Sequence, residues 1–146
     1  MASSEPERRF IEHLLLRPTL FDGVIKSPDR GFYALPYSYK PSTKARTHSR
    51  TEHFNPDFFL KLAGRQEILV VEIKDDGDDS NRNRAKCRDG LRHFRELNER
   101  LEREGLPWRY TFLFLSPDDF PEFFASVADG GYRRWTSALM GELATA

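Results

Sequence analysis

The sequence holds one cysteine and no apolar run long enough to cross a membrane. Because Cys87 stands alone among 146 residues, an internal disulfide framework is excluded and a reducing compartment is favoured. The chain opens with no signal-peptide pattern. Its apolar runs are far shorter than the roughly 20 residues of a membrane-spanning helix. We therefore expect a cytoplasmic protein that does not associate with membranes.

An excess of charge of either sign is also absent. Lys and Arg total 23 and Asp and Glu total 23, so the formal net charge is zero. A free-standing nucleic-acid-binding protein is usually basic overall, and the balance disfavours that class. The charges are unevenly distributed, however. Residues 40–50 hold four basic and no acidic residues, residues 82–103 hold eight basic and four acidic ones, and residues 75–79 form an acidic patch.

The length and composition are those of a globular domain. Hydrophobic residues make up 38% and charged residues 32% of the chain, which is typical of a folded protein with a sizeable core. A chain of this length is too short for two ordinary domains. We expect one domain over residues 1–146.

Periodicity and punctuation predict the order of the elements. Ser4 and Glu7 match a capping box at the start of a first helix, which ends at Pro18. Strands are expected at residues 21–26 and, more weakly because of Pro36, at 32–39. Further elements follow in this order: a loop at 40–50, a β-hairpin with arms 54–62 and 67–74, a loop at 75–83, a helix at 84–103, a strand at 108–115, and helices at 116–127 and 132–143.

This order predicts an α/β (α+β) fold. The strand–helix–strand unit over residues 67–115 implies a right-handed crossover and a parallel strand pair within a mixed sheet. The hairpin supplies antiparallel neighbours to that pair. We expect one central mixed sheet flanked by helices, with additional helices at the C-terminal end.

The hairpin carries charged residues beside its most apolar strand. Glu72 and Lys74 are two apart on one strand and face the same side, and Asp57 opens the neighbouring arm. Two carboxylates about 4 Å apart repel by roughly 4 kcal/mol at an effective dielectric of 20, so they require a cation. Lys74 supplies part of that charge, and carboxylate oxygens suit Mg²⁺ or Mn²⁺. Phosphodiester hydrolysis is a reaction that uses such a set.

The segments Asn55-Pro56-Asp57 and Glu72-Ile73-Lys74 resemble the motif of the PD-(D/E)xK nuclease superfamily. The chain looks closest to the C-terminal nuclease domain of type III restriction subunits and helicase-fused endonucleases. That resemblance implies a restriction-endonuclease-like αβββαβ core, which the expected order matches from Glu5 to Leu115. One departure is the Asp75-Asp76 pair after the motif lysine, where these relatives often have a small residue.

The resemblance also implies a function and a set of site residues. The function is a Mg²⁺- or Mn²⁺-dependent endonuclease that hydrolyses double-stranded DNA to products with 5′-phosphates. Asp57 and Glu72 would ligate the metal with the Ile73 carbonyl, Lys74 would position the attacking water, and Glu7 would complete or orient the metal shell. The basic helix and loop would hold DNA phosphates through Lys40, Lys44, Arg46, Arg82, Arg84, Lys86 and Arg88.

Partners are expected beyond the DNA itself. The sequence contains no G-x-x-x-x-G-K-[ST] loop, so we expect an ATPase or helicase and a DNA-recognition part to be supplied elsewhere, with this chain as the cutting module. Paired cuts across a duplex need two active sites, which favours a homodimer.

Other interpretations of the same residues stay open. Asp57 can be a turn residue that caps local amides, Glu72 and Lys74 a same-face ion pair, and Glu7 the capping partner of Ser4. The fold would then be an inactive nuclease-like module that docks DNA or protein. Cleavage of RNA or of branched junctions would keep the chemistry and change the substrate. A calcium loop at residues 75–79 and a zinc site at His48, His53 and Cys87 lack the required spacing.

Overall fold

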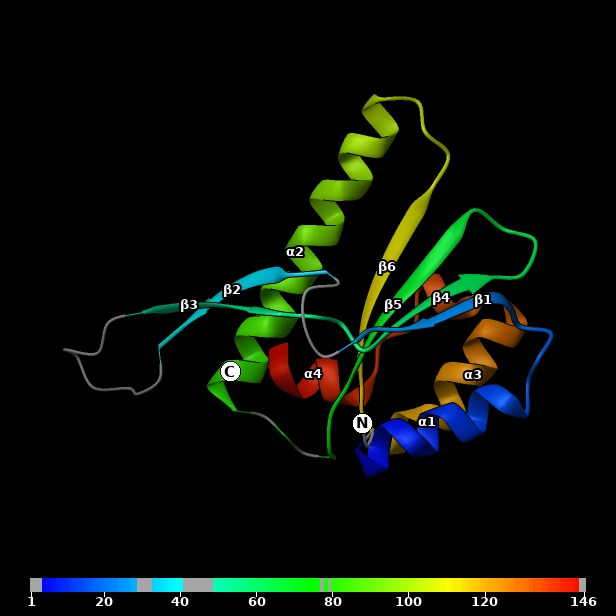
Figure 1. Ribbon diagram of the computed structural model, residues 1–146, viewed down its shortest axis with the longest axis horizontal. Coiled ribbons are helices and arrows are strands. Elements are labelled where there is room, and N and C mark those ends of the chain that lie inside the picture. The colour runs from blue at the N-terminus through cyan, green and yellow to red at the C-terminus, as the bar shows by residue number, and fades with distance from the viewer. Residues whose placement is uncertain (1–3, 29–32, 41–48, 77, 79, 145–146) are drawn as a thin grey trace.

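The computed structural model describes residues 4–28, 33–40, 49–76, 78 and 80–144. A four-stranded mixed sheet forms its centre, and a separate two-stranded ribbon extends from it (Figure 1). The elements are α1 (Glu5–Leu15), β1 (Phe21–Lys26), β2 (Leu35–Tyr39), β3 (Arg50–Phe54), β4 (Phe58–Leu62), β5 (Glu67–Ile73), α2 (Asn81–Arg103), β6 (Arg109–Leu115), the 3₁₀ turn η1 (Pro117–Asp119), α3 (Phe120–Asp129), the 3₁₀ turn η2 (Gly131–Arg133) and α4 (Ala138–Ala144).

The central sheet has the strand order β1-β4-β5-β6. Strands β1, β4 and β5 pair antiparallel, and β5 pairs parallel with β6 across the α2 crossover. The predicted parallel pair and the mixed α/β class are therefore confirmed. Leu69, Val70 and Val71 of β5 are fully buried because helices cover both faces of the sheet.

Two apolar cores lie on opposite faces of the sheet. One contains Phe10 of α1 with Phe120 and Phe124 from the η1–α3 segment, and residues of α4 complete it. The other contains Phe94 of α2 and Phe112 of β6, and the ribbon packs on it. The second core fixes the ribbon to α2 and so sets its orientation relative to the sheet.

The helix α1 begins as the sequence predicts. Ser4 and Glu7 form the capping box, and Phe10 is completely buried. The expected apolar stripe is only partly correct. Ile11 and Leu14 pack against the core, but Leu15 is 74% exposed because it lies in the last turn, beyond the edge of the sheet.

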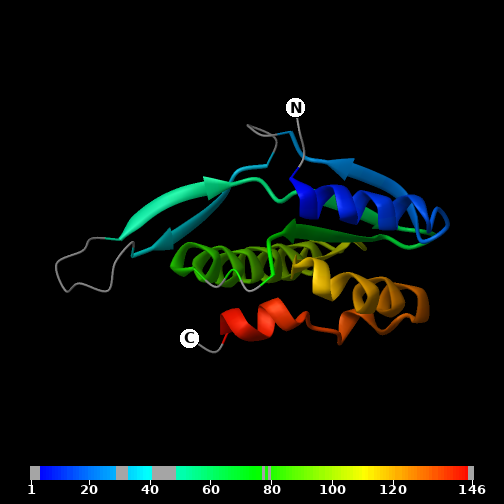
Figure 2. The same ribbon diagram turned by 90° about the horizontal axis from the view of Figure 1, so that it is seen from below.

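The predicted arm at 54–62 is wrong as a single strand. Phe54 ends β3, which pairs with β2, and Phe58 begins β4 in the central sheet. Asn55 and Pro56 divide the arm because proline donates no ladder hydrogen bond, and Asn55 Oδ1 instead accepts from Tyr33 N at 2.8 Å. The strand predicted at 32–39 thus forms a ribbon with β3, which begins at the last residue of the predicted 40–50 loop. Residues 41–48 of that loop lie outside the described residues. The ribbon runs past the N-terminal end of α2 (Figure 2).

Two helix boundaries also differ from the predicted ones. The helix α2 begins at Asn81, three residues earlier than expected, because the Ser80 hydroxyl accepts from Asn83 N. The predicted helix at 132–143 is instead the short turn η2 followed by α4. Asp119 Oδ1 accepts from Ala138 N at the start of α4. The side chain of Asp119 therefore connects η1 to the first residue of α4.

None of the helices in the described parts of the chain is both long and apolar enough to cross a membrane. The cytoplasmic location stays a prediction.

Candidate active site

Asp57 is fixed at the junction of three strands. Its carbonyl accepts from Ser27 N, just after β1, at 2.8 Å. Its Oδ2 accepts from the Ile73 amide, at the end of β5, at 2.7 Å. The antiparallel register that pairs Phe58 with Val71 brings these residues together. Backbone pairing therefore determines where the Asp57 carboxyl lies.

Glu72 lies beside Asp57 and is only 3% exposed. Its Oε2 is 3.6 Å from Nζ of Lys74 and 3.9 Å from Nζ of Lys86. Its Oε1 is one of two buried side-chain oxygens, with Ser27 Oγ, that have no hydrogen-bond partner within the described structure. A buried carboxylate oxygen without a donor is costly, so this oxygen requires an ordered water, a bound ion or a proton shared with Asp57.

Glu7 joins the same cluster from the first turn of α1. Its side chain is hydrogen-bonded with Asp57 and is half-buried. Its Oε2 also accepts from Ser4 N at 2.9 Å. Both interpretations of Glu7 are thus compatible in geometry, because one carboxylate closes the capping box and also contacts Asp57.

Burial and mutual repulsion favour retention of a proton by this group of carboxyls. Burial, followed by the negative charge of Glu72, raises the pKa of Asp57 well above its usual range. Burial also raises the pKa of Glu72, although Lys74 opposes the rise. Burial tends to raise the pKa of Glu7, but hydrogen bonds from Asp57 and Ser4 outweigh it and the net shift is downward. Asp57 is therefore the proton donor between two carboxylates.

Lys86 lies inside this cluster and not on the open helix surface. Its side chain is 13% exposed and its Nζ lies 5.6 Å and 5.3 Å from the ring centroids of Tyr37 and Phe54. Burial, and then the nearby charge of Lys74, lower the pKa of Lys86. The sequence analysis predicts Lys86 only as one of several phosphate contacts. Its i, i+2 spacing to Arg84 and Arg88 did not distinguish it from them.

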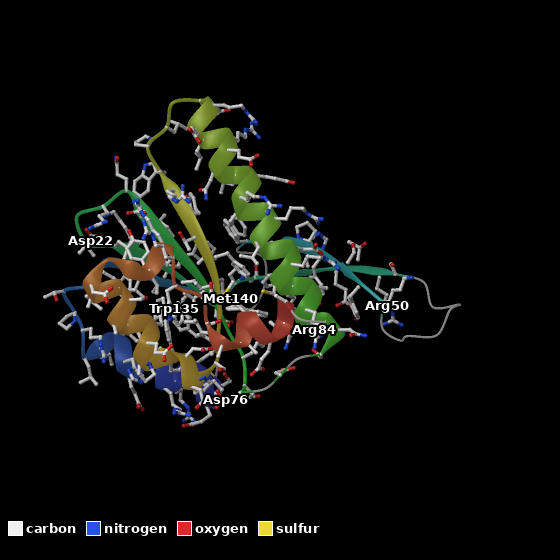
Figure 3. All side chains as sticks on the ribbon, turned by 180° about the vertical axis from the view of Figure 1, so that it is seen from behind. Asp22, Arg50, Asp76, Arg84, Trp135 and Met140 are labelled. Carbon is white, nitrogen blue, oxygen red and sulfur yellow. The ribbon has the colours of Figure 1, made fainter. Side chains whose placement is uncertain are left out.

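The other predicted DNA-binding residues are distributed around the site. Arg82 donates to Tyr39 Oη at 2.8 Å, and Arg88 pairs with Asp89. Arg84 donates to carbonyls at the end of α4 (Figure 3). Lys40 is exposed at the end of β2. Lys44 and Arg46 lie outside the described residues. The arginine contacts are intramolecular, and the predicted DNA contacts stay predictions.

The donor set suits a hard divalent cation. Asp57, Glu72 and the Ile73 carbonyl are the predicted ligands, and the unpartnered Glu72 Oε1 is an oxygen that a cation would satisfy. Among the described residues no group of three or more His, Cys, Asp or Glu side chains is arranged to hold a metal ion. Two carboxylates are nonetheless a common protein contribution to Mg²⁺, which keeps several waters. A bound metal stays a prediction, and the oxygens of these residues are compatible with it.

A groove of the described structure lies away from this cluster. It has a volume of about 980 Å³ and runs between the C-terminal half of α2 and the start of β6, past Asn98 and Trp108. The carboxylate cluster lies at the opposite ends of β5 and α2.

A zinc site of the kind considered from the sequence is not formed by the described residues. Cys87 is buried in the core, and burial raises the pKa of its thiol to about 11. His53 is exposed on the ribbon. His48 lies outside the described residues.

Comparison with known proteins gives no relative. No family model, curated protein or solved structure matches this chain. The PD-(D/E)xK resemblance therefore stays a prediction.

Proposed function

We propose that this chain is a metal-dependent nuclease domain that hydrolyses DNA phosphodiester bonds. The supporting observation is the cluster of Glu7, Asp57, Glu72, Lys74 and Lys86. Four elements of the fold bring these residues to one end of β5. Three carboxyls and two ammonium groups lie in one small region, where burial raises the pKa of Asp57 and lowers the pKa of Lys86. Such a cluster is typical of an active site.

Asp57 and Glu72 would hold the metal, together with the Ile73 carbonyl, while Glu7 would orient Asp57 from the α1 side. A bound Mg²⁺ or Mn²⁺ would supply Lewis-acid stabilisation of charge on the phosphate and would favour a deprotonated water. The proton on Asp57 must leave before its oxygens can serve as ligands. The site therefore has a defined resting state, in which a proton occupies the place of the cation.

The two lysines have different surroundings and are given different roles. Lys74 has a side chain that is 25% exposed, and it would orient the attacking water at the open side of the cluster. Lys86 is held deeper by aromatic rings, and it would place positive charge next to Glu72 and the reacting phosphate. Fixed cations that need no rearrangement during the reaction are an effective means of stabilising developing negative charge.

A docking module without catalysis is the second candidate. The observation that favours it is that the described residues include no ready group of three metal-ligating side chains, so that the cluster would serve as a buried, protonated network. A docking module would bind its partner equally well in chelator, and Asp57→Ala would bind as the wild type does. We propose an ATPase or helicase partner, and a homodimer for paired cuts, only for the nuclease function.

Cleavage of supercoiled plasmid tests the proposal. The purified chain is incubated with Mg²⁺, Mn²⁺ or EDTA beside Asp57→Asn, Lys74→Met and the control Asp22→Asn, an exposed aspartate paired with Lys61. We expect metal-dependent nicking that falls about 100-fold or more in the two site variants and persists in the control. Cleavage in EDTA, or undiminished cleavage by Asp57→Asn, would contradict the proposal. Single-stranded, branched and RNA substrates in parallel identify the substrate class.

A further inference from the structure

The β2–β3 ribbon has one face packed on the protein and one face exposed. Tyr37, Tyr39 and Phe54 on the inner face are buried against α2 and the sheet. On the outer face Ser38 and Thr51 are paired in register and exposed, and their hydroxyl oxygens lie 3.0 Å apart. The strands alternate inward and outward as a half-buried ribbon must.

The ribbon is fixed firmly in its orientation. Asp89 of α2, which is 2% exposed, accepts from Ser38 N at 2.9 Å. Arg88 donates to the Ser38 carbonyl and pairs with Asp89. These contacts close the outer edge of β2, while β3 closes its other edge. The outer face is therefore displayed by a rigid support, because helix side chains satisfy the backbone groups at its edge.

The chemistry of the exposed face is suited to an anionic polymer with hydrogen-bonding groups. Glu52 is the one acidic residue among the described residues of the ribbon, and its carboxylate accepts from the hydroxyls of Tyr37 and Tyr39 on the inner face. The exposed residues of the outer face are Pro36, Ser38, Lys40, Ser49, Thr51 and His53, which together carry one permanent cation and no carboxylate. Arg50 is exposed at the end of β3, where it pairs with Tyr39 in the register of the inner face. Figure 3 shows Arg50 at the outer end of the ribbon.

The ribbon is directly connected to the candidate active site. Only Asn55 and Pro56 separate the end of β3 from Asp57. Lys86 lies between the ribbon rings of Tyr37 and Phe54 on one side and Glu72 on the other. The inner face of the ribbon is therefore in contact with the carboxylate cluster through Lys86.

We propose that the outer face of the β2–β3 ribbon enters the major groove of duplex DNA and reads base edges beside the cleavage site. The major groove of B-DNA admits a two-stranded β-ribbon, and hydroxyl, imidazole and methyl groups contact base edges there. Thr51 and His53 are the reading residues, and Lys40 and Arg50 hold the flanking phosphates. This inference rests on the proposed function for the identity of the polymer.

Equilibrium binding in EDTA tests the ribbon separately from cleavage. The probe is a pool of fluorescent random-sequence 24-base-pair duplexes, and the bound fraction is sequenced. Lys40→Gln/Arg50→Gln should weaken binding to all sequences by about tenfold and reduce the salt slope by about 2. Thr51→Val and His53→Ala should change which sequences are selected, by about tenfold at the positions that each residue reads. The controls Arg134→Gln and Thr136→Val alter exposed residues outside the ribbon and should do neither.

The possible results separate this inference from the proposed function. Unchanged affinity and selection in the ribbon variants would overturn it, as would equal binding of single-stranded DNA or RNA, or no duplex binding by the wild type. Ribbon-dependent binding without metal-dependent cleavage would support the ribbon and reject the nuclease. Metal-dependent cleavage that the ribbon variants leave unchanged in rate and sequence preference would support the nuclease and reject the ribbon.

Discussion

Lys86 Nζ lies 3.9 Å from Glu72 Oε2, although the two residues belong to α2 and β5. Lys74 approaches the same oxygen at 3.6 Å. One buried carboxylate oxygen is thus close to two ammonium groups, while its partner oxygen has no hydrogen-bond donor in the described structure. The charge on Glu72 Oε2 is therefore balanced by two ammonium groups, while Oε1 is available to a cation.

Lys86→Met tests whether the second lysine is part of the site. Methionine keeps an unbranched chain beside Tyr37 and Phe54 but removes the charge. We expect metal-dependent cleavage to fall about 100-fold, because a fixed cation next to the reacting phosphate is lost. Lys61→Met, at a lysine paired with Asp22 outside the cluster, should cleave as the wild type does. Equal loss in both variants would indicate a general effect of charge.

Asp57→Asn should make the metal-free protein more stable at pH 8. The folded-state pKa of Asp57 is raised, so the folded chain binds a proton that the unfolded chain has released. The contribution of Asp57 to wild-type stability is therefore greatest below the ordinary aspartate pKa and declines as pH rises toward the folded value. Asparagine can donate to Glu7 and Glu72 at every pH and can still accept from Ile73 N.

The gain from Asp57→Asn is expected to be about 1 kcal/mol at pH 8 and to disappear near pH 4. Urea unfolding of the metal-free proteins across this pH range measures it. A variant that is less stable than the wild type at pH 8 would contradict the assignment of the shared proton to Asp57.

Glu67 ties the start of β5 to the C-terminal part of the chain. It is buried and accepts from Tyr132 Oη at 2.6 Å and from Arg133 at 2.8 Å. Burial tends to raise the pKa of Glu67, but these donors outweigh it and lower the pKa. The ionised form is thus favoured in the folded state. Its stabilisation is present above the usual glutamate pKa and is lost as pH falls through the folded value.

Glu67→Gln should therefore lower the free energy of unfolding by about 1–3 kcal/mol at pH 7, with a smaller difference below about pH 4. Glu122→Gln, at an exposed position on α3, is the matched control and should be near neutral. Denaturant unfolding at several pH values provides the measurement. A difference that grows as pH falls would contradict the assigned direction of the shift.

Gly90 and Gly141 should respond oppositely to alanine. A Cβ at Gly90 would lie 2.5 Å and 2.7 Å from ring atoms of Phe112, so α2 packs on β6 at a distance that only glycine permits. Gly90→Ala should cost about 1–3 kcal/mol through overpacking. Gly141 in α4 has no atom within 4 Å of such a Cβ, and alanine there should gain up to about 1 kcal/mol from helix propensity. Thermal unfolding distinguishes the two, and equal shifts would contradict the packing.

Period-two alternation was sufficient to predict part of the site. Glu72 and Lys74 had to share a face because they are two apart on a strand, and the hairpin placed Asp57 opposite them. The contribution of Glu7 depended on the angle at which α1 crosses the sheet, which no local pattern specifies. Lys86 was one of several basic residues with similar spacing, and only tertiary packing distinguishes it from Arg84 and Arg88.

The ribbon was missed for a different reason. Residues 54–62 form one continuous stretch with strand-like composition, and the break at Asn55 and Pro56 depends on a side-chain contact from Asn55 to Tyr33 N. Pro36 weakened the prediction of β2, yet proline is tolerated there because β2 pairs with only one strand, β3. Long-range pairing of this kind is determined by the whole fold and not by sequence periodicity.

Calorimetric titration with Mn²⁺ tests most directly whether the carboxylate cluster is a metal site. The metal-free wild type, Asp57→Asn and the control Asp22→Asn are titrated in two buffers of different ionisation enthalpy at one pH. We predict binding by the wild type and the control with release of a proton, because the cation displaces the proton of Asp57, and no binding by Asp57→Asn. Absence of binding by the wild type, or equal binding by Asp57→Asn, would contradict the account and favour a docking module.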